Sequence, residues 1–92
     1  MLSKIPFDYK TLGNDTIDVE VLRVGIIAEL DAINLYEQLA KIATNPKIKK
    51  ILLDIAKEEK THVGEFQALL LQLDKEQVKE LEEGKKEVEE LT

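Results

Sequence analysis

Apolar side chains recur every three or four residues along two long stretches of the chain, residues 16–43 and 46–73. This spacing is typical of helices that bury one face, because residues three and four apart lie on the same side of an α-helix. No stretch shows the strict alternation of apolar and polar residues that indicates a half-buried strand. The inward-facing positions are Leu22, Ile26, Glu29, Ile33, Tyr36, Ala40 and Ala43 on the first stretch, and Ile48, Leu52, Ile55, Glu59, His62, Phe66, Leu69 and Leu73 on the second.

Capping residues mark the ends of these two helices. Residues 1–15 show no sustained period and are expected to form an irregular arm, with Thr16 as the N-cap of the first helix. Asn45 and Pro46 suit the N-cap and the first helical position of the second helix. Because only about two residues separate the helices, we expect them to form an antiparallel hairpin.

A third, shorter and more polar helix is predicted over residues 75–91, with Asp74 as its N-cap. The sequence therefore predicts an all-α fold, an antiparallel two-helix hairpin plus a shorter C-terminal helix. We expect the 92 residues to form a single domain. A chain this short buries a modest core by itself, so a partner chain is expected.

Composition excludes several classes of function. The net charge is −6, with acidic and basic residues interspersed, which argues against a nucleic-acid-binding protein because such proteins need a basic face. The absence of cysteine excludes disulfides, thiolate metal sites and thiol catalysis. No apolar run has the length of a membrane span, and the N-terminus lacks the apolar segment of a signal peptide. These features favour a cytoplasmic location.

Three ionisable residues interrupt the two apolar stripes at the same level of the hairpin. Glu29 lies 15 residues before Thr44, and Glu59 lies 15 residues after it, so their carboxylates should stand side by side. His62, the only histidine, is one helical turn beyond Glu59 on the same face. A buried carboxylate is costly unless it is paired, protonated or bound to a metal. The alternatives to a metal site are a surface pair of Glu59 with His62, or a buried Glu29 satisfied by a lysine or tyrosine.

The three residues are half of a known kind of metal centre. A carboxylate-bridged di-iron site in a four-helix bundle takes one Glu from each of two helices and a Glu-x-x-His pair from each of the other two. Two copies of this chain, related by a two-fold axis, would supply four Glu and two His on four helices. Oxygen and imidazole donors suit iron or manganese, and zinc or calcium are expected as substitutes.

The segments "AELDAINLYEQLA" and "LLDIAKEEKTHVGEF", with Glu29 and Glu59 30 positions apart, resemble the encapsulated ferritins. The resemblance covers both long helices, residues 19–73, and the third helix falls where that family has its own. It implies a homodimer that forms a ferritin-like four-helix bundle, and decameric rings of such dimers. It also implies a ferroxidase that oxidises Fe(II) inside an encapsulin nanocompartment in the cytoplasm.

The resemblance implies a role for individual residues. Glu29, Glu59 and His62 match the metal ligands, with Glu59 as the bridging carboxylate, and Tyr36 matches the tyrosine near the site. The alternative for Tyr36 is a purely structural position in the core, with its hydroxyl on some other partner.

The path by which iron reaches the site involves two acids on the first helix of the family. Asp31 matches one of them, and Ala28 stands at the position of the other. The alternative for Asp31, as for Glu58 and Glu65, is a solvated surface position. The final residues "KKEVEELT" contain no apolar cargo tag, so association with the encapsulin shell protein is expected either as cargo or by fusion to it.

Two other functions remain open from the sequence. A rubrerythrin-like peroxide reductase usually takes electrons from a cysteine-bound iron centre, and this chain, which has no cysteine, would need a separate electron donor. The second is a non-enzymatic helical dimer in which the metal has only a structural role.

Overall fold

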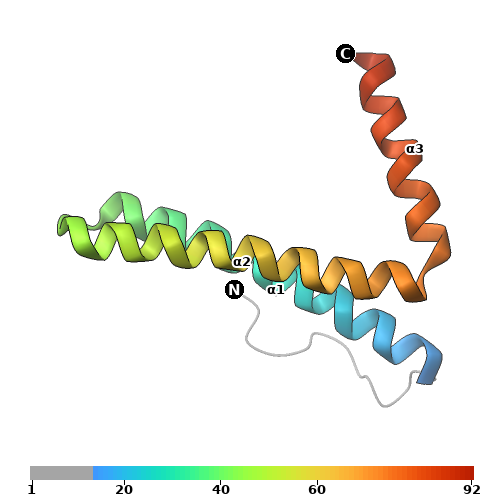
Figure 1. Cartoon of the computed structure of the whole chain (residues 1–92), viewed down its shortest axis with the longest axis horizontal. Coiled ribbons are helices and arrows are strands. Elements are labelled where there is room, and N and C mark those ends of the chain that lie inside the picture. The colour runs from blue at the N-terminus through green and yellow to red at the C-terminus, as the bar shows by residue number, and fades with distance from the viewer. Residues whose placement is uncertain (1–13) are drawn as a thin grey trace.

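The computed structural model describes residues 14–92, and the side chains from residue 17 onward. Three helices follow one another along this part of the chain: α1 (Asn14–Ile42), α2 (Pro46–Leu73) and α3 (Lys75–Leu91). α1 and α2 lie side by side as an antiparallel hairpin, and α3 turns away from its open end (Figure 1). The predicted all-α fold of a two-helix hairpin and a shorter C-terminal helix is confirmed. None of the helices is long and apolar enough, within this part of the chain, to cross a membrane.

The start of α1 differs from the prediction. The helix begins at Asn14, so Thr16 is a helical residue and the prediction that it is the N-cap was wrong. The pattern of apolar residues does not mark this start, because Asn14 and Asp15 are polar and Asp favours the positive end of the helix dipole. The rest of the expected irregular arm, residues 1–13, lies outside the described residues.

The hairpin turn forms through the cap that the sequence indicates. The Asn45 side chain accepts hydrogen bonds from the backbone N–H of Lys47, at 2.8 Å, and of Ile48, at 3.2 Å. Pro46 then occupies the first turn of α2, where its missing N–H leaves no helical hydrogen bond unmade. The tight turn brings the two helices back along each other.

Asp74 joins α2 to α3 and ties both to α1. Its backbone N–H donates to the Leu70 carbonyl at 2.8 Å, which closes the last turn of α2. One carboxylate oxygen accepts from the backbone N–H of Gln77 at 3.0 Å, as the predicted N-cap of α3. The other accepts from the Arg23 guanidinium at 3.0 Å. One side chain therefore caps α3 and sets where it leaves the hairpin.

The core of the single chain is small. Among the residues described, the buried apolar ones are Leu22, Ile33, Ala40, Ala56 and Leu70. Fourteen large apolar side chains of the described residues are exposed, including Ile48, Leu69 and Leu73 of the stripe predicted to face inward on α2. These three lie toward the two ends of α2, and in one chain α1 alone does not cover them. The hairpin thus leaves much of its apolar surface open.

Candidate metal centre

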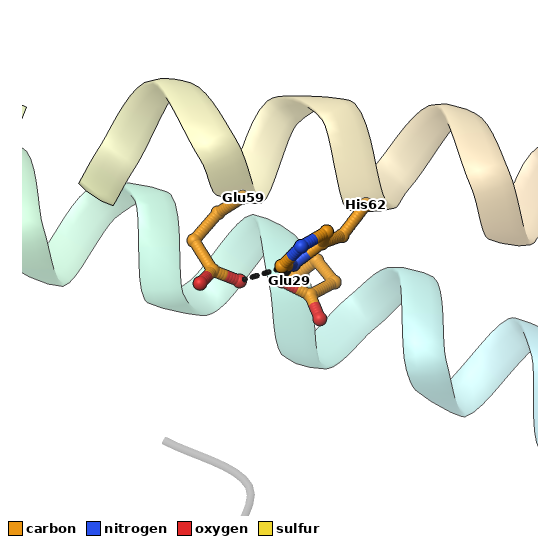
Figure 2. A group of neighbouring side chains, drawn as sticks. All are labelled: Glu29, Glu59 and His62. Atoms are coloured by element: carbon orange, nitrogen blue, oxygen red, sulfur yellow. Dashed lines mark hydrogen bonds and ion pairs between the residues drawn. The ribbon is translucent and has the colours of Figure 1, made fainter. Parts of the chain in front are cut away.

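Three side chains from the two long helices converge at the middle of the hairpin. Glu29 comes from α1, and Glu59 and His62 come from successive turns of α2 (Figure 2). One ligand atom from each residue lies within 4.8 Å of those of the other two. Glu29 and Glu59 stand at the same level because the helices run antiparallel from a short turn. Glu59 and His62 share a face because three residues make nearly one helical turn.

The imidazole lies between the two carboxylates. His62 Nδ1 is 3.4 Å from Oε2 of Glu59 and 3.5 Å from Oε2 of Glu29. Both distances are longer than the 2.7–3.2 Å usual for an N–H···O hydrogen bond. The ring nitrogen therefore makes a long hydrogen bond to Glu59 and approaches the Glu29 carboxylate at a similar distance.

Burial makes this arrangement costly for the protein alone. The Glu29 and Glu59 side chains are 19% and 18% exposed, respectively, whereas His62 is 44% exposed. Oε2 of Glu29 is buried and has no hydrogen-bond partner among the described residues. A buried carboxylate oxygen without a hydrogen bond loses its hydration, and the His62 Nδ1 contact at 3.5 Å replaces only part of it. A cation between these groups would supply the missing interaction.

The donor set fits a divalent transition metal. Two carboxylates and one imidazole suit iron or manganese, and zinc also accepts such ligands. Three donors do not complete the coordination of any of these ions. The half-exposed imidazole shows that the cluster is open on one side, where further ligands can approach.

Two other residues named from the sequence lie outside this cluster. Tyr36 is half-buried on the same stripe of α1, but seven residues beyond Glu29, which is about 10 Å along the helix axis. Asp31 is two residues beyond Glu29, a step that turns it to a different side of the helix. The group of acidic and histidine side chains that the structure brings together, within residues 14–92, is Glu29, Glu59 and His62. The proposed roles of Tyr36 and Asp31 stay predictions.

One residue beside the cluster was not singled out from the sequence. Gly25 lies one turn before Glu29 on α1, and the ring of Phe66, one turn after His62 on α2, packs against it. The sequence does contain a feature that could have identified it, a glycine in the interior of a predicted long helix, four residues before a candidate ligand.

The family comparison matches residues 20–92 to the sequence model described as Rubrerythrin. A solved structure, the encapsulated ferritin domain from Pyrococcus furiosus, superposes with a TM-score of 0.85 at 57% identity. That similarity covers 96% of this chain and 88% of the solved chain.

Curated relatives carry names that refer to encapsulins. The chain is 65% identical, over 74 residues, to the ferritin-like-encapsulin shell fusion protein of Pyrococcus furiosus, covering 80% of this chain and 21% of that protein. It is 38% identical, over 61 residues, to the encapsulin nanocompartment cargo protein EncB of Myxococcus xanthus, covering 66% of this chain and 39% of that protein. The cargo protein EncC of Myxococcus xanthus is 39% identical over 70 residues, covering 76% of this chain and 54% of EncC. The chain thus spans between about a fifth and about half of these relatives.

Proposed function

The chain belongs to the encapsulated ferritins, within the rubrerythrin family, and we propose that it oxidises Fe(II) to Fe(III) at a two-metal site shared between two chains. The observation that carries the proposal is that ligand atoms of Glu29, Glu59 and His62 lie within 4.8 Å of one another, with a buried Glu29 oxygen that has no hydrogen-bond partner among the described residues. A ferritin-like, iron-related protein is the broader function that the family membership supports.

Two chains make the site complete. A two-fold axis beside the open side of the cluster doubles the donors to four carboxylates and two imidazoles. Four negative charges then balance two Fe(II) ions, which removes the cost of burying the carboxylates. The same pairing would cover apolar side chains that one chain leaves exposed among the described residues, and large exposed apolar patches are unusual on monomers. A dimer is thus the minimum assembly that we propose, and a decameric ring is the assembly that the family resemblance implies.

The side chains have separate tasks in this proposal. Iron is the substrate: the two Fe(II) together give two electrons to O₂, which takes up two protons from water and leaves as hydrogen peroxide. Glu29 and Glu59 supply hard, negatively charged oxygens, which favour Fe(III) over Fe(II) and so help the oxidation. Glu59, which lies beside His62 on α2, is the carboxylate we propose to bridge the two metal positions. His62 supplies a neutral nitrogen donor that limits the negative charge at the site.

The product would be stored inside an encapsulin shell in the cytoplasm. The names of three relatives support this proposal, since one is a fusion of a ferritin-like domain with the shell protein and two are cargo proteins. The shell protein is therefore the proposed partner, in addition to further copies of this chain.

A peroxide reductase is the second candidate, and the match to the rubrerythrin model favours it. It needs electrons from a donor outside these 92 residues, because they contain no cysteine with which to bind an electron-carrying iron centre. Comparing O₂ with hydrogen peroxide as oxidant of the Fe(II)-loaded protein separates the two activities.

The test is Fe(II) oxidation in air, followed by absorbance, at two irons per dimer. Glu29→Ala, Glu59→Ala and His62→Ala should each lose most of the activity of the wild-type protein. Glu65→Ala is the matched control, because Glu65 is an exposed acid on the same helix as Glu59. Circular dichroism shows whether each variant is folded. Wild-type rates from folded Glu29→Ala or His62→Ala protein would show that the oxidation site lies elsewhere.

A metal that is purely structural is a separate outcome of the same assay. In that case the wild-type protein binds Fe(II) at the cluster but oxidises it no faster than buffer does.

A further inference from the structure

Gly25 stands in the interior of α1, where glycine is the least favourable residue apart from proline. The packing around Gly25 explains why a side chain is absent at this position. A Cβ atom built on Gly25 would lie 3.2 Å from Cε2 of Phe66 and 3.3 Å from both Cδ2 and Cζ. These separations are shorter than ordinary van der Waals contact, so the ring occupies room that any other residue would fill. The other two glycines among the described residues, Gly64 and Gly84, meet nothing within 4 Å at the same position.

The contact lies next to the metal-binding cluster on both helices. Gly25 is four residues before Glu29, and Phe66 is four residues after His62. Side chains on a helix lean toward its N-terminus, so the Phe66 ring leans back toward His62 and meets α1 one turn from Glu29. The glycine–phenylalanine contact therefore forms the layer of packing immediately adjacent to the ligands.

We infer that Gly25 is a positioning residue for the metal site. By admitting the Phe66 ring, it lets α1 and α2 approach closely enough to hold Glu29 opposite Glu59 and His62. The inference rests on the proposed function only in taking these three side chains as metal ligands, and it concerns metal binding more directly than oxidation.

The size of the effect follows from the tolerance of metal coordination. Relief of a 3.2 Å contact requires a movement of a few tenths of an ångström, by the ring, by the helix or by both. Metal–ligand distances hold to about 0.2 Å. Phe66 is on the same helix as His62, one turn away, so the part of the movement that the helix takes up also displaces this ligand. Loss of a residue that orients metal ligands typically weakens metal binding by about 10- to 100-fold.

The experiment measures Co(II) binding to the full chain, by titration of the visible absorbance of the bound ion, which also reports its coordination. Gly25→Ala should bind Co(II) at least about 10-fold more weakly than the wild-type protein and with an altered spectrum. Gly64→Ala is the matched control, the same change in an exposed position of α2, and should stay within about twofold of the wild-type protein.

A second pair of variants tests the mechanism, with Phe66 reduced to Leu. Once the ring is absent, the added methyl group of Gly25→Ala fills space instead of causing a clash. The double variant should therefore bind Co(II) more tightly than Phe66→Leu alone, the opposite sign to the effect in the wild-type background. This comparison also decides the matter if Gly25→Ala by itself fails to fold.

The outcomes separate this inference from the proposed function. Equal Co(II) affinity in Gly25→Ala and the wild-type protein, or further weakening in the double variant, overturns the positioning role while leaving the metal site in place. Wild-type protein that binds no Co(II) overturns both proposals. Wild-type protein that binds Co(II) and shows the change of sign, but does not oxidise Fe(II), overturns the ferroxidase proposal alone.

Discussion

Replacement of Glu29 by Gln should stabilise the metal-free protein while weakening its response to metal. The substitution keeps the shape of the side chain and removes its charge. The Glu29 side chain is 19% exposed and its Oε2 has no hydrogen-bond partner among the described residues. A carboxylate also lies close by, on Glu59. The charge at position 29 therefore lowers the free energy of unfolding unless a cation is bound.

Two estimates bound the gain in the free energy of unfolding. A buried polar atom without a partner costs about 1–3 kcal/mol and more when it is charged, and the neutral Gln amide relieves only the part that comes from the charge. Two carboxylates whose oxygens lie within 4.8 Å repel each other by at least about 3.5 kcal/mol at an effective dielectric constant of about 20. The two costs overlap, because partial protonation or a small movement relieves both. We expect Glu29→Gln to stabilise the metal-free protein by about 1–3 kcal/mol.

The response to metal should change in the opposite direction. A metal that binds only the folded protein stabilises it by about 2.7 kcal/mol at 100 times its dissociation constant. Glu29→Gln removes one anionic ligand from each chain, so most of that gain should disappear at the same metal concentration. The assay is urea unfolding followed by circular dichroism, at one protein concentration, in EDTA and in excess Mn(II).

The matched control is Glu65→Gln, which makes the same chemical change at an exposed position of α2. It should alter the free energy of unfolding by less than about 0.5 kcal/mol in either condition. A Glu29→Gln protein that is less stable than the wild type in EDTA would refute the idea that this carboxylate is buried at a cost. An undiminished gain from Mn(II) would refute its role as a ligand.

Three further outcomes are expected. Light scattering at micromolar concentration should show a dimer or a larger assembly, because one hairpin leaves so much apolar surface open; a well-folded monomer, with and without iron, would contradict this. Saturating Fe(II) under anaerobic conditions should raise both the melting temperature and the fraction of assembled protein, and unchanged values would mean that the ligands are not shared between chains. Asp74→Ala should lower the free energy of unfolding by about 1 kcal/mol, because it removes the N-cap of α3. Lys60→Ala, the control, breaks only an exposed pair with Glu37 and should have a smaller effect. Equal effects of the two variants in urea unfolding would contradict the capping role.

The sequence by itself determined the helices and the level of the candidate ligands. The caps at Asn45 and Asp74 act on backbone groups within three residues of themselves, so local chemistry is enough to predict them. The short turn then defines the antiparallel pairing, and counting from it brings Glu29 and Glu59 together. The start of α1 was the exception, because polar residues extend a helix without adding to its apolar stripe.

Only the tertiary structure decided how the helices fit. The pairing of Arg23 with Asp74 joins residues 51 apart, and it depends on the angle at which α3 leaves α2. The packing of Phe66 on Gly25 depends on the distance between α1 and α2, which a repeating pattern of apolar residues does not define. The spacing of apolar residues in the sequence indicates only which face of a helix is apolar. Side-chain shape, summed over both surfaces, sets the separation and angle at which two such faces meet.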